Sequence, residues 1–331
     1  MEHESARGKA AVEKFMYGSR GALIVTGERR SGKSSLCKHI ANSHFTSKDT
    51  FFVRAPREGC ANVALFEKSL YEAIQSVRKT EGLPMEYKGS DSLETLLPGL
   101  ESKCVVVIHD LELWWERRES GTAVVERLID LIGLYGRDIL FIINANIHSL
   151  KMIDSITSLN SWAFDVIECR PFPAKQLKEF IIARHNAGGL RFVMDDKAQE
   201  QMSGWDYAKL FNHIFNLSAG NPGYAINLWL GSIKNISGDT LIMEKPVGAD
   251  GRVVSMLSAD DAVIILQFVL HRRFSVPRLA SLLMTNENYL AAKVRVMHQE
   301  GILTEKYPGV YSLNPMLVPH LVKKLKSLDL V

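Results

Sequence analysis

Short apolar runs alternate along the first half of the chain with longer segments that carry apolar residues at helical spacing. The apolar runs predict buried strands, and the segments between them predict helices. The five predicted strands are Ala22–Thr26, Phe51–Arg54, Cys104–Ile108, Ile139–Ile143 and Phe164–Cys169. Strands that alternate with helices predict a right-handed, doubly wound parallel sheet whose ligand lies at the carboxyl ends of the strands.

The helices of this α/β region are predicted by the same periodicity. Apolar residues recur at helical spacing in Ser35–Ala41, Leu65–Val77 and Ala123–Leu134. The third strand is apolar throughout, which is typical of a strand buried on both faces of a parallel sheet. The polar, glycine-bearing stretch 79–92 predicts a loop.

The pattern changes after Pro171, where the strands are expected to stop until a hairpin near the C-terminus. Helices are predicted over Lys175–His185 and Tyr207–Ile233, the latter interrupted at Gly220-Asn221-Pro222-Gly223. The stretch Ser237–Ser255 is rich in glycine and charge and predicts a linker.

The C-terminal segment predicts a winged helix. Helical patterns over Ala259–His271, Val276–Met284 and Glu287–Gln299 precede a β-hairpin around Lys306-Tyr307-Pro308, and a helix at Val318–Leu328 closes the chain. The predicted organisation is a P-loop core (1–171), a helical lid (172–235), a linker (236–255) and a winged helix (256–331).

Between the first strand and its helix lies a complete phosphate-binding loop. A glycine-rich turn between strand and helix allows backbone N–H groups to surround phosphate oxygens at the helix N-terminus. Lys33 is expected to reach the β- and γ-phosphates, and the Ser34 hydroxyl to ligate Mg²⁺. The residues predicted to bind nucleotide here are Gly27, Glu28, Arg29, Arg30, Ser31, Gly32, Lys33, Ser34 and Ser35.

Composition and charge restrict the expected partners and cellular location of the protein. The 331 residues include 46% hydrophobic and 23% charged residues, and the formal charge of +3 is too small to indicate nucleic acid by itself. The four cysteines are far apart, without metal-ligand spacing, and are expected to be reduced. No apolar run approaches the length of a membrane span, so we expect a cytoplasmic protein without membrane insertion.

The order of parts resembles the AAA+ superfamily of ATPases, and within it the signal-transduction NTPases of the STAND group and, less closely, origin-recognition-type ATPases. The core-to-lid junction at Glu168–Pro173 and the lid element Ser218–Pro222 are similar to those of STAND proteins. The resemblance implies that Pro222 packs the nucleotide. It also implies binding of ATP or ADP with Mg²⁺, oligomer formation in the ATP state and a protein effector.

The third strand ends in His109-Asp110-Leu111-Glu112, where such ATPases hold Mg²⁺ and orient the attacking water. Asp110 is the expected Mg²⁺ ligand, and an alternative register places His109 there and Asp110 in the catalytic position. Leu111 stands where the family usually has glutamate. Glu112 is either a substitute acid or a solvated residue after the strand, so hydrolysis is expected to be slow or dependent on a partner.

Further expectations follow from this resemblance. Asn144, after the fourth strand, is expected to contact the γ-phosphate or the attacking water, with Asn146 as the competing position. The segment before the fifth strand lacks an arginine finger, and Gly223 stands where many lids carry an arginine. Asn314 occupies the position at which STAND proteins place a winged-helix histidine on bound ADP.

The adjacent tryptophans after the third strand and the predicted recognition helix are the two candidate contact surfaces outside the phosphate site. Trp114 and Trp115 are adjacent and cannot both face one core along a helix, so one of them is a candidate for exposure. Packing against the neighbouring helix is the favoured role, and contact with an oligomer or a partner is the alternative. The predicted recognition helix carries only Lys293, Arg295 and His298 as basic candidates. The sequence therefore favours an ATP-hydrolysing switch, with a DNA-binding ATPase and a non-hydrolysing nucleotide-binding module as alternatives.

Overall fold

Five parallel strands form the central sheet of the first domain, in the order β2-β3-β4-β1-β5. The computed structural model describes residues 2–78, 87–100, 103–195 and 197–331, so residues 79–86 of the predicted loop lie outside it. The strands are β1 (Ala22–Gly27), β2 (Thr50–Val53), β3 (Cys104–Ile108), β4 (Ile139–Asn146) and β5 (Ala163–Cys169). The predicted parallel α/β core is confirmed, and β1 lies between β4 and β5.

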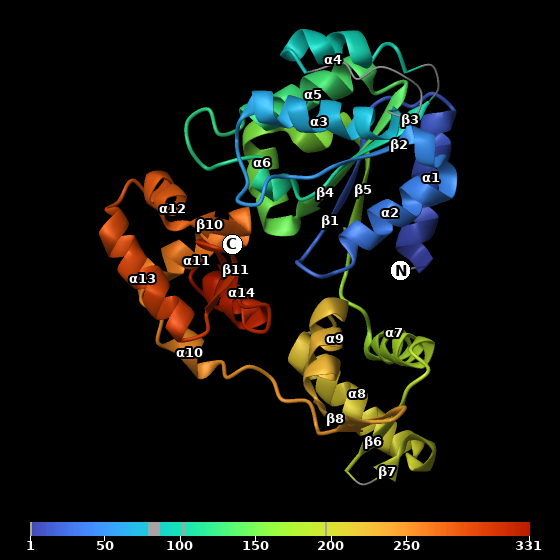
Figure 1. Cartoon of the computed structure of the whole chain (residues 1–331), viewed down its shortest axis with the longest axis vertical. Coiled ribbons are helices and arrows are strands. Elements are labelled where there is room, and N and C mark those ends of the chain that lie inside the picture. Colours follow the sequence, from blue (N-terminus) through green and yellow to red (C-terminus); the bar gives the residue numbers. More distant parts are fainter. Residues whose placement is uncertain (1, 79–86, 101–102, 196) are drawn as a thin grey trace.

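Helices cover both faces of this sheet (Figure 1). The core helices are α1 (Glu2–Met16), α2 (Lys33–His44), α3 (Val63–Arg78), α4 (Ser90–Leu96), α5 (Ala123–Tyr135) and α6 (Ile147–Thr157). Because side chains alternate along a strand, Leu23 and Val25 of β1 pack with α1 and α2, whereas Ala22 and Ile24 belong to the core on the opposite face. Helices α1 and α4 are not among the predicted elements.

The lid contains helices and a small sheet. Its helices are α7 (Ala174–Ala187), α8 (Gly204–Ser218) and α9 (Pro222–Gly231). Its strands β6 (Arg191–Met194), β7 (Lys197–Ala198), β8 (Ile233–Ser237) and β9 (Thr240–Met243) pair in the order β7-β6-β9-β8. The lid builds its own apolar cluster, separate from that of the core.

The prediction that the strands stop after Pro171 is therefore wrong. Strand β6 pairs with β9, which lies about 50 residues later in the chain. Strand β8 has no fully buried side chain, so it lacks the alternation of buried and exposed residues that predicts a strand. The stretch predicted as a linker also contains β9 and the short helix α10 (Arg252–Ser255). Short strands that are stabilised by distant partners escape detection by periodicity alone.

The winged helix is confirmed. It contains α11 (Ala259–His271), β10 (Arg273–Ser275), α12 (Val276–Leu283), α13 (Glu287–Gln299), β11 (Leu303–Tyr307), β12 (Val310–Leu313) and α14 (Val318–Ser327). An antiparallel sheet in the order β10-β12-β11 completes it, and β10 is an addition to the predicted elements.

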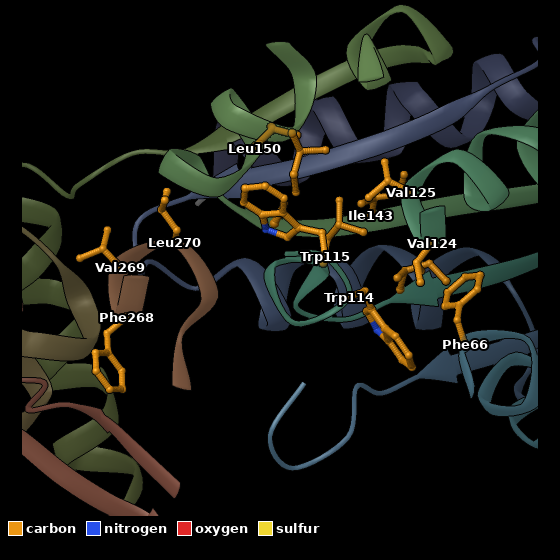
Figure 2. Close-up of a cluster of buried hydrophobic side chains, with 14 of the residues drawn as sticks. Phe66, Trp114, Trp115, Val124, Val125, Ile143, Leu150, Phe268, Val269 and Leu270 are labelled. Carbon is orange, nitrogen blue, oxygen red and sulfur yellow. The ribbon is translucent and has the colours of Figure 1, made fainter. Parts of the chain in front are cut away.

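The winged helix packs directly on the core domain, and their buried residues form one continuous apolar cluster. Both adjacent tryptophans belong to this cluster and are fully buried, so the expectation that one is exposed is wrong. They follow a single 3₁₀ turn rather than lying on a regular helix, which allows their rings to diverge. Trp114 meets Phe66 of α3, with ring centroids 5.2 Å apart (Figure 2). Trp115 meets His271 of α11, with ring centroids 4.7 Å apart.

All four cysteines are free thiols, as expected, and three of them are buried. In the residues that the structure describes, no helix has both the length and the apolar character needed to cross a membrane.

Candidate functional site

The phosphate-binding loop joins β1 to α2 with the geometry that its glycines predict. Gly27 has φ +146°, and a Cβ atom there would lie 2.7 Å from the carbonyl oxygen of Cys169. Gly32 has φ +97° and directly precedes α2, whose first helical residue is Lys33. Only glycine adopts such backbone angles without strain, so both positions require it. The loop therefore presents the N-terminus of a twelve-residue helix to an incoming anion.

Lys33 lies at the centre of this loop. Its ammonium donates hydrogen bonds to the carbonyl oxygens of Gly27 (2.9 Å) and Glu28 (2.7 Å). Burial lowers the pKa of Lys33, and the carboxylates of Glu112 and Asp110 oppose that shift. A buried lysine held by two carbonyls has only part of its charge satisfied, and a phosphate oxygen would satisfy it more fully.

Strand β3 delivers Asp110 to the same place. The carboxylate of Asp110 lines the cavity beside the loop, whereas the His109 ring stacks on Phe52, with centroids 5.7 Å apart. Of the two registers considered for the metal ligand, this geometry favours Asp110. Burial would raise the pKa of Asp110, but the neighbouring guanidinium of Arg272 outweighs burial and holds the pKa below its usual range.

Glu112 is buried beside Asp110 rather than solvated. Its side chain lies in the 3₁₀ turn after β3, lines the cavity, and accepts a hydrogen bond of 3.0 Å from the backbone N–H of Asn146. A carboxylate that is 3% exposed and still faces a cavity is placed to act on a ligand there.

Asn144 and Asn146 take different positions although both lie on β4, which extends three residues beyond its predicted end. The Asn144 amide is fully buried and donates to the Ser34 hydroxyl at 2.9 Å. Asn146 caps α6 by accepting from the N–H of His148. Asn144 thus faces the phosphate loop, and Asn146 has a structural role at the helix start.

The lid element at the start of α9 binds the phosphate loop directly. The Asn221 side chain donates to the carbonyl oxygen of Arg29 at 2.8 Å, and the Gly223 N–H donates to that of Arg30 at 3.1 Å. A Cβ atom on Gly223 would lie 2.4 Å from the Cβ of Arg30. This close contact leaves no room for a side chain at Gly223, the position where the AAA+ resemblance implies a lid arginine.

These elements enclose one cavity of about 610 Å³. The loop contributes Arg29 through Ser35, and the lid contributes Pro222 together with the apolar side chains of Phe172, Phe180 and Ile226. Gly27 and Glu28 do not line the cavity and act through their carbonyls. The apolar lid residues are not among the predicted ligand contacts, because nothing in their local sequence distinguishes them from lid core.

The cavity is strongly basic. Among the described residues, two carboxylates line it, those of Asp110 and Glu112, against seven cationic side chains: Arg29, Arg30, Lys33, Arg184, Arg272, Arg273 and Lys306. Such an excess of positive charge next to a helix N-terminus favours a polyanion. The volume and the apolar lid end fit a nucleotide, whose base is apolar at its faces and whose phosphates are charged.

The winged helix forms the third wall of the cavity, which sequence reasoning missed. Arg272, at the end of α11, forms an ion pair with Asp110, and its carbonyl accepts from the Arg29 guanidinium at 3.2 Å. Arg273, which also lines the cavity, donates to the carbonyl of Pro56 at 2.9 Å. From the sequence alone, basic residues of the winged helix suggested only contacts with DNA.

Asn314, the predicted counterpart of a nucleotide-contacting histidine, has another role. Its amide donates to the carbonyl of Gly301 at 2.8 Å and its side-chain oxygen accepts from the N–H of Met316 at 3.0 Å. Both bonds brace the base of the wing. Pro315 and Ser312, close to it in sequence, line the cavity, and Asn314 does not.

The donor set fits Mg²⁺. The Ser34 hydroxyl and the Asp110 carboxylate are oxygen donors that line the same cavity from α2 and from the end of β3. Mg²⁺ in nucleotide sites uses one or two protein oxygens and completes its shell with phosphate oxygens and water. No cluster of three metal-ligating side chains occurs among the described residues, so protein groups alone offer no richer metal site.

Comparisons with known proteins give similarity at the level of structure only. No protein-family model matches the chain, and no curated protein matches it in sequence. Solved structures that resemble it over nearly its full length are AAA+ ATPases at low identity. The ORC2 protein of Aeropyrum pernix, described as ADPNP–ADP complexes, is 12% identical with a TM-score of 0.49, covering 98% of this chain and 93% of that one.

Two further structures show the same range of similarity. The ORC1 protein of Aeropyrum pernix in complex with DNA is 13% identical, with a TM-score of 0.49 and coverage of 98% and 92%. A Walker-type ATPase of Pyrococcus abyssi is 16% identical, with a TM-score of 0.39 and coverage of 98% and 95%. Sequence identities of 12–16% indicate a similar fold and do not define a function.

Proposed function

We propose that this chain binds ATP with Mg²⁺ in the cavity between its three domains and hydrolyses it slowly. The observation that carries the proposal is the convergence of Lys33, Ser34 and Asp110 on one cavity next to a helix N-terminus, with the buried Asn144 amide directly behind Ser34. Separate segments of the chain supply a phosphate-binding amine, two metal-ligand oxygens and a polar amide, which is the donor set of phosphoryl-transfer sites.

Each residue has a defined task in this proposal. The backbone N–H groups of residues 29–34 surround the phosphates, and Lys33 moves from the loop carbonyls to the β- and γ-phosphate oxygens. Ser34 and Asp110 hold Mg²⁺, which neutralises charge on the phosphates when bound. Asn144 contacts the γ-phosphate or the attacking water, and Glu112 orients that water.

The same geometry supports slow turnover. Leu111 replaces the usual acid, and one oxygen of Glu112 is already occupied by the Asn146 N–H. A carboxylate that accepts a backbone hydrogen bond is a weaker base towards water. In addition, Asp110 shares its charge with Arg272.

The nucleotide base belongs at the lid end of the cavity. Phe172 and Phe180 meet edge to face at 5.6 Å and line it together with Pro222. Adenine over guanine rests on the AAA+ resemblance, and the comparisons give no support for the STAND group in particular. The cavity is walled by core, lid and winged helix, so a change at the γ-phosphate reaches all three, and we infer a switch that controls an oligomer or a protein effector.

Phosphate release from ATP by the purified chain tests this function, with Lys33→Ala as the inactive variant and Lys38→Ala, exposed on the same helix, as the matched control. Light scattering in ATP and ADP reports oligomeric state in parallel. Turnover that depends on Lys33 but not on Lys38 is expected. Tight binding without turnover would favour a non-hydrolysing module, and unchanged turnover in Lys33→Ala would contradict the proposal.

A DNA-binding ATPase is the second candidate, supported by the winged-helix fold with α13 lying on its surface. Of its basic residues, Lys293 pairs with Asp261 at 2.9 Å, which leaves Arg295 exposed. Binding to a duplex of mixed sequence tests this candidate. Affinity that falls steeply with salt and weakens in Arg295→Ala would support it, and no binding at low salt would exclude it.

A further inference from the structure

Arg272 belongs to the winged helix, yet its side chain enters the cavity of the core domain. It is the residue between α11 and β10, the part of the winged helix that lies against the core in Figure 1. Its guanidinium pairs with Asp110, and 31% of the Arg272 side chain and 28% of that of Asp110 remain exposed to the cavity. A partly exposed ion pair at this place can exchange one partner for a ligand.

The backbone at Arg272 is strained, and its neighbours hold it in place. Its φ of +73° and ψ of −46° lie near a γ-turn that residues with a side chain rarely adopt. On one side α11 is buried, and on the other Arg273 is fixed by the carbonyl of Pro56. The Arg29 guanidinium also donates to the Arg272 carbonyl. Strain that is maintained from three sides and aims a cation at a functional carboxylate indicates a functional constraint.

Electrostatics then decide where this guanidinium goes when ligand binds. Asp110 cannot serve both Mg²⁺ and an arginine equally well, because the two cations repel each other across one carboxylate. ATP would bring its phosphates to the cavity beside Asp110, and only ATP carries the terminal phosphate, so that group is the new partner that we infer for Arg272. Arginine suits this exchange because its planar fork binds a carboxylate and a phosphate with the same geometry.

Other cationic side chains of the cavity are less suited to this task. Arg273 is turned to Pro56, and Arg184 lies over the Phe180 ring at 4.6 Å. Residues 158–163, before and at the start of β5, contain no basic residue, and Gly223 occupies the lid position where an arginine would clash with Arg30. Among the arginines outside the phosphate loop, Arg272 is therefore the best-placed source of a γ-phosphate contact.

We propose that Arg272 is the γ-phosphate-contacting arginine of this site, held on Asp110 and transferred to the terminal phosphate when ATP with Mg²⁺ binds. This inference rests on the proposed nucleotide site. ADP lacks the group that receives the guanidinium, so Arg272 distinguishes ATP from ADP. Because Arg272 directly follows α11, this contact links the terminal phosphate to the winged helix.

Equilibrium binding to the full chain tests the proposal without relying on turnover. Affinities for a non-hydrolysable ATP analogue and for ADP, both with Mg²⁺, are measured by calorimetry for the wild type, Arg272→Ala and Arg272→Lys. Arg252→Ala, whose side chain is 86% exposed, is the matched control for loss of a positive charge. Circular dichroism checks that each variant is folded.

The wild type is expected to bind the analogue more tightly than ADP. Arg272→Ala should weaken analogue binding by about tenfold or more, the size expected for a lost charge-assisted hydrogen bond, and change ADP binding far less. Arg272→Lys should recover part of this preference, and it carries the test if Arg272→Ala does not fold. Equal loss for both nucleotides, or none for the analogue, overturns the proposal. A wild-type chain that binds neither nucleotide overturns the nucleotide site itself.

Discussion

Single residues in this protein have roles that their chemistry suggests but that their surroundings decide. Asn144 and Asn146 are two positions apart on one strand, yet the first contacts Ser34 and the second caps α6. Glu112 follows a strand end, where a solvated acid is common, but it is buried and faces the cavity. Residue type restricts the choice of roles, and the direction of the side chain selects among them.

Replacing Glu112 by glutamine should separate nucleotide binding from hydrolysis. In Glu112→Gln the new amide oxygen can still accept from the Asn146 N–H, so binding should be retained. Turnover should fall about a hundredfold, as for loss of a general base. Phosphate release and calorimetry are the measurements, with the exposed Glu119→Gln as control. Unchanged turnover would show that Glu112 does not orient the water.

Gly223 is predicted to be intolerant of any side chain. In Gly223→Ala the new Cβ would meet the Cβ and the carbonyl of Arg30, at 2.4 and 2.8 Å in the present geometry. Lid and loop would have to separate, at a cost of about 1–3 kcal/mol as for overpacked sites. We expect weaker nucleotide binding in calorimetry. Gly231→Ala, on the same helix with open space around it, should leave affinity unchanged, and equal effects in both would refute this explanation.

At the level of elements, the joint between core and winged helix is more extensive than an ordinary domain contact. Helix α12 places Arg278 against Glu116 at 2.7 Å, and Ser275 donates its N–H to Glu58 at 3.0 Å. The apolar clusters of the two domains are continuous across the same joint. The lid has its own apolar cluster, and among the described residues Tyr224 of α9 is the lid residue that joins the cluster of core and winged helix.

Arg278→Ala should weaken this joint strongly. The substitution leaves the carboxylate of Glu116, which is 6% exposed, with only Arg118 as a charged partner among the described residues. Because Arg118 still compensates part of the Glu116 charge, the cost should stay below the value of about 3–5 kcal/mol for a fully unpaired buried charge, and the midpoint of denaturant unfolding should fall measurably below that of wild type. Arg295→Ala, exposed on α13, is the control. A difference of less than about 1 kcal/mol would show that the pair is unimportant.

At the level of the whole molecule, the cavity proposed to bind nucleotide is lined by residues of all three domains. The loop and strand ends supply the phosphate and metal donors, the lid supplies apolar contacts, and the winged helix supplies Arg272. The arrangement in Figure 1 therefore links the state of the ligand to the positions of lid and winged helix. This dependence is what a nucleotide-controlled switch requires.

The joint between core and winged helix should weaken on acidification. Burial lowers the pKa of His271 to about 3 and that of His148 to about 4, from 6.5. Below pH 6.5 the unfolded chain binds protons that the folded chain excludes, so stability falls as pH decreases towards these values. Each histidine should reduce the free energy of unfolding by about 2 kcal/mol between about pH 7 and about pH 5.

Denaturant unfolding at about pH 7 and about pH 5 checks this expectation. His271→Phe keeps an aromatic ring between Trp115 and Phe274 and should remove about half of the pH dependence. His298→Phe, on the exposed part of α13, serves as the control. The explanation fails if both variants keep the full pH dependence of the wild type.

The amino-acid sequence by itself determined the phosphate loop, the five core strands and the winged helix, because each depends on local spacing. Gly27 to Ser34 form one continuous motif, and the spacing of apolar residues within each short segment predicts the buried strands and helices. The same local signals indicated Lys33, Ser34 and Asp110 as the residues that handle phosphate and metal.

Only the tertiary structure decided what closes the site. The pairing of Arg272 with Asp110, the contact of Gly223 with Arg30 and the lid sheet each join segments far apart in the chain. The two adjacent tryptophans are both buried for the same reason, since a turn and a neighbouring domain determine their surroundings. Such contacts depend on how domains pack, and packing leaves no periodic signal in the residues that meet.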